Sequence, residues 1–85
     1  MLNILNMNEN RIKQIMSKVF EVSINKINES TSQDDFYNWD SLHHIEMIIM
    51  LENEFNIKIS DEDIVNMTKY ILIKNIINDK IQNKN

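Results

Sequence analysis

The sequence predicts an all-α protein, a small four-helix bundle with three longer helices, one short third helix and a long loop between the first two. Three observations predict it. Apolar residues recur at the three- and four-residue spacing of amphipathic helices along most of the chain. Residues that commonly cap helices stand at the borders of these stretches. The alternation "NIKIS" at 56–60 resembles a strand but has no partner strand. At 85 residues, a single domain over 1–85 is expected.

The first helix is expected from about Asn8 to Glu21. Its apolar residues follow the spacing i, i+3, i+4, i+7, i+8, and they are Ile12, Ile15, Met16, Val19 and Phe20. Residues 22–39 show no sustained period and are rich in serine and asparagine, which favour turns and caps. This stretch is therefore expected to be a long loop, and such loops are often functional. Four apolar residues could hold it against a core: Val22, Ile24, Ile27 and Phe36.

The second helix is expected from Ser41 to about Phe55, and Asn56 can adopt the left-handed conformation that ends helices. "ISDED" then resembles a capping box, with Ser60 at the cap and Asp63 three residues later. It predicts a short third helix over roughly Asp61–Asn66.

The last helix is expected to be capped by Thr68 and to run to about Lys80. Its inward residues would be Tyr70, Ile73, Ile76 and Ile77. The end of the chain, 81–85, is expected to fray.

The second helix carries apolar residues on two opposite faces. One stripe of ordinary width should face the core and consists of His44, Met47, Ile48, Leu51 and Phe55. The opposite face holds Leu42, Ile45 and Ile49, with Glu46, Glu52 and Asn53 among them or at their edges. Two explanations remain open at this point. The helix is central and covered on both sides, or the second face is exposed and docks partners through apolar anchors with a charged rim.

Charge and composition exclude several functions. Residues 29–63 hold ten acidic residues and one basic residue, which disfavours nucleic acid and suits either a solvated surface or partners with basic patches. No apolar run approaches the ~20 residues of a membrane span, and the start lacks the basic region of a signal peptide. A soluble cytoplasmic protein is expected. The chain has no cysteine, so disulfides and thiolate metal sites are excluded.

Asp40 and Ser41 open the second helix, where a helix cap and an anion-binding position are both possible. With His43 and His44 they also suggest a hydrolase, but residues this close on one helix cannot converge as a triad requires. There is no Gly-x-Ser-x-Gly motif. A metal site at His43 and Glu46 lacks further ligands at suitable spacing, so neither a catalytic nor a metal site is expected.

"DSL" stands at the start of an apolar and acidic helix and is followed by "LENEF", a short link, "ISDEDI" and a final helix. In this pattern the chain resembles an acyl carrier protein from about Arg11 to Ile77. The resemblance implies that Ser41, flanked by Asp40 and Leu42, carries 4'-phosphopantetheine, installed from coenzyme A by a phosphopantetheinyl transferase. The arm's thiol would hold an acyl or aminoacyl group as a thioester, so the chain would be a carrier and not an enzyme.

The resemblance also implies roles for two further sets of residues, one that binds partners and one that shelters the acyl group. Partner enzymes such as a ligase, ketosynthase or acyltransferase would dock on the second helix at Leu42, Ile45, Glu46, Ile49 and Glu52. The acyl group would be sheltered by Met47, Leu51, Phe55, Ile59, Ile64, Met67 and Ile73. A monomer without nucleic-acid or membrane partners is expected.

Several residues depart from the family pattern. Asn38-Trp39 precedes Asp-Ser, His43 stands in place of an acid, Asn53 replaces another, and bulky Ile73 occupies an interior position where a small residue is common. The Trp-Asp-Ser-Leu motif resembles dedicated carriers, which implies a short or unusual cargo in a specialised pathway. Partner specificity is expected at Trp39 and His43. The alternative is an unmodified carrier-like adaptor subunit.

Overall fold

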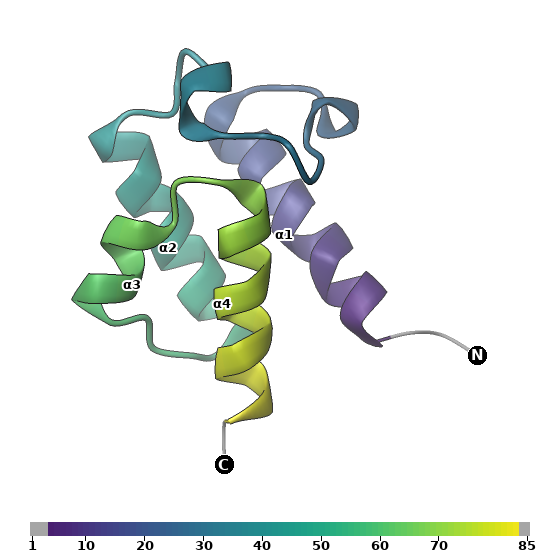
Figure 1. Ribbon diagram of the computed structural model, residues 1–85, viewed down its shortest axis with the longest axis vertical. Helices are drawn as coiled ribbons and strands as arrows, with labels where there is room; N and C mark the ends of the chain where they lie inside the picture. Colours follow the sequence, from purple (N-terminus) through teal and green to yellow (C-terminus); the bar gives the residue numbers. More distant parts are fainter. Residues whose placement is uncertain (1–3, 84–85) are drawn as a thin grey trace.

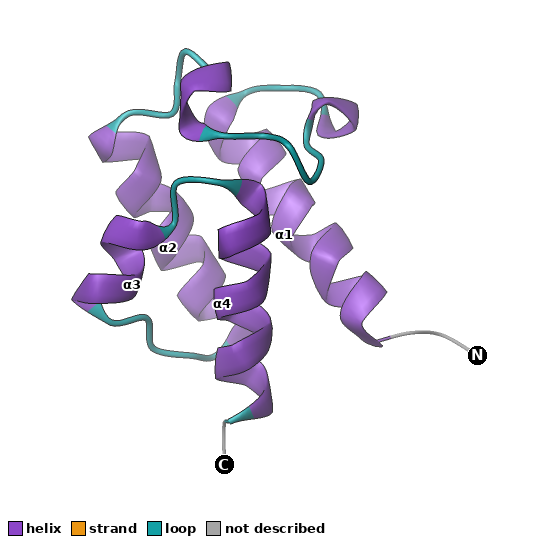
Figure 2. Cartoon of the chain, in the orientation of Figure 1, coloured by secondary structure: helices purple, strands orange, loops and turns teal. Residues whose placement is uncertain are grey.

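The computed structural model describes residues 4–83, with side chains from residue 7, and this part of the chain is helical without a strand (Figure 2). Its four α-helices are α1 (Ile4–Phe20), α2 (Ser41–Phe55), α3 (Asp61–Asn66) and α4 (Tyr70–Gln82). The predicted all-α fold, with one short third helix and a long loop after the first, is confirmed. Their buried residues form one core, which the long loop covers at one end (Figure 1).

Helix α1 begins about one turn before the predicted Asn8. The prediction was wrong there because the apolar period starts only at Ile12, and a helix can extend beyond the residues it buries. Its end at Phe20 follows from Glu21, which has a left-handed φ of 57° and cannot continue the helix. The predicted apolar stripe of this helix is buried throughout.

The loop between α1 and α2 contains two short 3₁₀ helices, η1 (Ile24–Lys26) and η2 (Gln33–Asp35). Ile27 and Phe36 are buried, as expected of residues that hold the loop to the core. Thr31 is also buried, and its hydroxyl donates to the carbonyl of Lys26 at 3.1 Å. The loop is therefore an ordered covering layer over one end of the bundle.

Helix α4 begins at Tyr70, with Lys69 and not Thr68 at its N-cap. The prediction was wrong because the backbone here bonds to the loop. Gln33 donates to the carbonyl of Thr68 at 2.9 Å, and Tyr70 donates to that of Thr31 at 3.0 Å. These bonds hold the chain extended until the helix starts.

The other end of α4 lies beyond the predicted Lys80. The helix continues to Gln82, while 84–85 lie outside the described residues, so fraying of the chain end stays a prediction. Tyr70, Ile73 and Ile77 are buried as predicted, and Ile76 is partly buried.

The predicted caps of α2 and α3 are confirmed. Asn56 ends α2 with a left-handed φ of 53°. Ser60 accepts a hydrogen bond from the N–H of Asp63 at 3.2 Å and so caps α3. The carboxylate of Asp63 pairs with Lys80 of α4 at 3.0 Å, which ties the short helix to the last one.

Candidate functional site

Ser41 is the first residue of α2, and its side chain is exposed. The preceding Asp40 is the N-cap, since its carboxylate accepts a hydrogen bond from the N–H of His43 at 2.9 Å. Within residues 4–83 the Ser41 hydroxyl makes no hydrogen bond. Capping therefore falls to Asp40, and the hydroxyl of Ser41 is left available for reaction.

The position suits a phosphodiester. The first N–H groups of a helix have no acceptor within it, and the helix dipole places partial positive charge there. A phosphate on Ser41 would stand at the start of a 15-residue helix, next to these groups. The exposed hydroxyl and the helix N-terminus thus fit a phosphate-linked group.

His43 and Asp40 form a hydrogen-bonded pair beside Ser41, with His43 Nδ1 2.7 Å from Asp40 Oδ1. The backbone N–H of His43 and then its ring lower the pKa of Asp40 below its ordinary value. The hydrogen bond to Asp40 in turn raises the pKa of His43. The pair keeps a carboxylate at the site and partly balances its charge when the imidazole is protonated.

His44 forms a bridge between the loop and α3. The indole N–H of Trp39 donates to its Nδ1 at 2.9 Å, and its Nε2 lies 2.8 Å from the carbonyl oxygen of Ile64. Because an indole N–H only donates, Nδ1 accepts and the ring hydrogen stands on Nε2, from which it donates to Ile64. Both nitrogens are satisfied, so the inward position predicted for His44 carries a specific polar link.

Trp39 is 3% exposed and stacks on Phe20, with ring centroids 4.6 Å apart. The loop turns this ring into the core, so the effect on partner specificity that is expected at Trp39 stays a prediction and would act through the packing of the ring. One signal in the sequence pointed to its true role. A buried tryptophan needs an acceptor for its N–H, and His44 stands five residues later, on the inward face of α2.

The two apolar faces of α2 are now distinguished. Met47, Ile48 and Leu51 are buried, and Phe55 is partly buried. On the opposite face Leu42, Ile45 and Ile49 are 69%, 46% and 51% exposed, and we call these three residues the docking strip after the role that the sequence predicts for them. The helix is not covered on both sides within the described residues, so the first of the two explanations is excluded.

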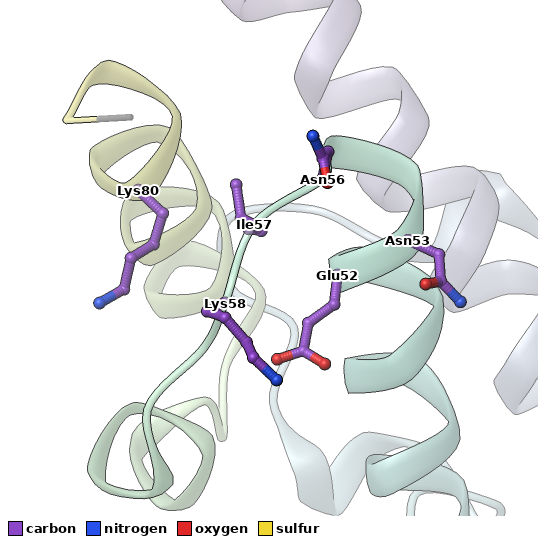
Figure 3. Close-up of a pocket in the computed structure, with 6 residues that line it drawn as sticks. All are labelled: Glu52, Asn53, Asn56, Ile57, Lys58 and Lys80. Atoms are coloured by element: carbon purple, nitrogen blue, oxygen red, sulfur yellow. The ribbon is translucent and has the colours of Figure 1, made fainter. Parts of the chain in front are cut away.

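The two acidic residues that were predicted on the docking face differ in exposure and in their contacts. Glu46 is exposed beside the strip. Glu52 is partly buried, and its Oε2 accepts the backbone N–H of Ile59 at 2.9 Å. Figure 3 shows Glu52 lining a polar hollow at the far end of α2, together with Lys58 and Lys80. Glu52 therefore supports the α2–α3 link, away from Ser41.

Sequence reasoning missed Val65 of α3, which is 74% exposed. It borders the same groove as Ser41 and Ile45. This groove between α2 and α3, which we call the Ser41 groove, has a volume of about 250 Å³. Its lining residues are Gln33, Ser41, His44, Ile45, Ile64, Val65 and Thr68. The exposed apolar surface near Ser41 thus continues from α2 onto α3.

The residues predicted to shelter an acyl group lie in or against the core. Five are buried, Met47, Leu51, Ile59, Met67 and Ile73, and two are partly buried, Phe55 and Ile64. Of the seven, Ile64 is the one that also lines the Ser41 groove. The groove and the core thus meet at the His44–Ile64 contact.

Neither histidine is directed at Ser41. His43 pairs with Asp40, and His44 bonds to Trp39 and Ile64. No cluster of three potential metal ligands occurs among the described residues. Nor does any helix in residues 4–83 have the length and apolar character needed to cross a membrane.

Comparison with known proteins identifies the family of the chain. Residues 10–69 match the family model "Phosphopantetheine attachment site". The acyl carrier protein of Buchnera aphidicola subsp. Acyrthosiphon pisum (strain 5A) is 40% identical over 77 residues, or 91% of each chain. That of Buchnera aphidicola subsp. Baizongia pistaciae is 41% identical over 70 residues, which cover 81% of this chain and 88% of the relative.

The fold has a close counterpart among solved structures. The solution NMR structure of the holo acyl carrier protein from Geobacter metallireducens superposes with a TM-score of 0.79 at 24% identity, covering 89% of this chain and 87% of that one. Since the family model spans well over half of the 85 residues, the chain belongs to the acyl carrier protein family, it is a carrier and not an enzyme, and its cofactor is covalent 4'-phosphopantetheine.

Proposed function

We propose that Ser41 is the attachment residue and that the chain presents a thioester-bound acyl or aminoacyl group to partner enzymes. The observation that carries the proposal is the exposed, unbonded hydroxyl of Ser41 at the first residue of α2, within the matched residues 10–69. In the attachment step the Ser41 oxygen attacks the β-phosphorus of coenzyme A. A phosphodiester forms, the diphosphate bond breaks, adenosine 3',5'-bisphosphate leaves, and a base of the transferase takes the hydroxyl proton. A chain without cysteine thereby gains a thiol.

The docking strip is the proposed contact for the transferase and for acyl-loading and acyl-using enzymes, such as a ligase, ketosynthase or acyltransferase. Leu42, Ile45 and Ile49 supply apolar anchors, exposed Glu46 supplies an acidic rim, and Val65 extends the surface onto α3. Small interfaces of this kind suit a carrier that visits several enzymes, and salt should weaken them. We also propose that the protein acts as a monomer in the cytoplasm.

The cargo we propose is a short or unusual acyl or aminoacyl group of a specialised pathway. Support comes from bulky Ile73, which is buried in the core, and from His43, which replaces an acid beside the docking strip and pairs with Asp40. The seven core residues named above would surround any part of a cargo that entered. Mass spectrometry of the protein purified from its native host would identify the cargo. A preponderance of ordinary long fatty acyl chains would refute this part.

Attachment is tested by intact-mass measurement after incubation with a phosphopantetheinyl transferase and coenzyme A. We expect a gain of one phosphopantetheinyl group, lost in Ser41→Ala. Ser60→Ala is the matched control, because Ser60 is likewise an exposed serine at the start of a helix. Its gain should equal that of the unaltered protein. No gain with any transferase would instead favour the unmodified adaptor, and a gain that persists in Ser41→Ala would move the attachment elsewhere.

A further inference from the structure

We propose that His44 is a specificity-determining residue, which closes the way from Ser41 into the core and so confines the carrier to short or polar cargo. The inference rests on the proposed attachment at Ser41. It deepens that function by assigning the choice of cargo to one side chain and its two hydrogen bonds.

The Ser41 groove is the space next to the attachment residue. Ser41 itself lines it, together with Ile45 of α2 and with Ile64 and Val65 of α3. Its volume of about 250 Å³ lies below the roughly 300–1,000 Å³ of pockets that bury drug-sized ligands. A group tethered at Ser41 meets this small groove first.

His44 and Ile64 lie where this groove borders the core. Both residues line the groove, and the side chain of Ile64 also packs against the buried cluster. The imidazole donates to the Ile64 carbonyl at 2.8 Å and thereby ties α2 to α3 across the path inward. Met47, three residues after His44, and Met67, three residues after Ile64, are fully buried. An acyl chain entering from Ser41 between the two helices would have to break the bond and displace packed side chains.

The imidazole is also held in place from the other side. Trp39 donates to its Nδ1 at 2.9 Å and stacks beside it, with centroids 6.3 Å apart and planes inclined by 19°. Trp39 in turn stacks on Phe20 in the core. Rotation of His44 would therefore leave the indole N–H, the Ile64 carbonyl or both without a partner, which is unfavourable away from water.

Whether an acyl chain can reach the core determines how its length affects the protein. Each methylene that leaves water favours the buried state by about fourfold, so a long chain with access to the core would be strongly sequestered. With the way closed by His44, added methylenes gain little. Thioester reactivity should then be nearly independent of chain length in this protein.

The test uses the full chain loaded by a transferase from butyryl-, octanoyl- and dodecanoyl-coenzyme A, with loading verified by intact mass. Two readouts follow: the rate of thioester cleavage by hydroxylamine, and the NMR shifts of the methyl groups of Met67 and Ile73, which are fully buried. For the unaltered protein we expect cleavage rates within about twofold of one another and unchanged core methyl shifts, because no methylenes enter the core.

Three variants identify the residue. His44→Leu removes both hydrogen bonds, so the dodecanoyl form should be cleaved at least about tenfold more slowly than the butyryl form, with shifted core methyl signals. His44→Gln can still accept from Trp39 and donate to Ile64, and it should behave as the unaltered protein does. Glu54→Leu is the control on the same helix, at an exposed position that does not line the groove, and it should leave the chain-length series unchanged.

Protection that grows with chain length in the unaltered protein would overturn the proposal, and this arm decides even if His44→Leu fails to fold. A folded His44→Leu that shows no chain-length dependence would overturn the role of His44. Failure to gain mass at Ser41 has a different meaning, since it would overturn the proposed function and this inference with it.

Discussion

Trp39→Phe tests the link between the loop, α2 and α3. The substitution keeps an aromatic ring that can stack on Phe20 but removes the N–H that donates to His44 at 2.9 Å. An acceptor left without its donor costs about 1–3 kcal/mol when buried, and His44 is only partly buried, so the lower half of that range applies. The smaller ring also leaves space in the core, for about 1 kcal/mol more.

The expected loss in the free energy of unfolding is therefore about 2–3 kcal/mol. A domain of 85 residues has a total of roughly 4–13 kcal/mol, so the loss is a large fraction of it. The melting temperature should fall by about 8–24 °C, at roughly 4–8 °C per kcal/mol for a chain of this size. Urea unfolding followed by far-UV circular dichroism measures the free energy without relying on tryptophan fluorescence.

A double-mutant cycle isolates the hydrogen bond from the loss of ring volume. Trp39→Phe, His44→Leu and the double variant should show a coupling of about 1 kcal/mol, since residues that share a contact are not additive. The matched cycle of Trp39→Phe with His43→Leu should show none beyond about 0.5 kcal/mol. Additive effects in the first cycle, or a loss below about 1 kcal/mol for Trp39→Phe, would refute the reasoning.

Three further predictions concern the start of α2 and its exposed face. In Asp40→Asn, NMR titration should show the pKa of His43 falling back toward its ordinary 6.5, because the carboxylate that raises it is gone. Because the pKa of His43 is raised in the folded state, the Asp40–His43 pair stabilises the fold below pH 6.5. This stabilisation is lost as the pH rises through the pKa that His43 has in the folded protein. The loss should vanish in Asp40→Asn. Ser41→Ala should melt no lower than the unaltered protein by circular dichroism, because the cap is Asp40 and alanine favours helix; a lower melting temperature would assign capping to the serine. Ile49→Ala should weaken binding to a partner enzyme in surface plasmon resonance, with Leu72→Ala, also an exposed apolar residue but on α4, as the unaffected control; equal effects would refute the docking strip.

The helices that could be predicted closely are those whose ends are encoded nearby. Asp40 and Ser60 bond to N–H groups three residues later, and Asn56 adopts the left-handed conformation by itself. Such signals lie within a few adjacent residues, so sequence alone locates α2 and α3. The start of α4 depends instead on bonds from Gln33 and to Thr31, more than 30 residues away in the chain. No local pattern contains that information.

The candidate site likewise has features that the sequence predicts and features that depend on contacts between distant parts of the chain. The exposure of the docking strip follows from angular positions on one helix, which the sequence supplies. The burial of Trp39 requires that the loop fold back onto Phe20, which a spacing argument cannot reveal. Val65 belongs to a six-residue helix, too short for a periodic pattern to show which face it presents.

The two proposals place choice of cargo and choice of partner on different faces of helix α2. His44 belongs to the inward stripe and borders the groove, while Ile49 is exposed in the docking strip and does not line the groove. A change at His44 should therefore alter chain-length dependence and leave docking intact, and a change at Ile49 should do the reverse. Ile45 lies in both the strip and the groove, so Ile45→Ala should affect both properties. If every change along α2 affected both properties alike, the two faces would not act separately, and disturbance of the helix as a whole would be the simpler cause.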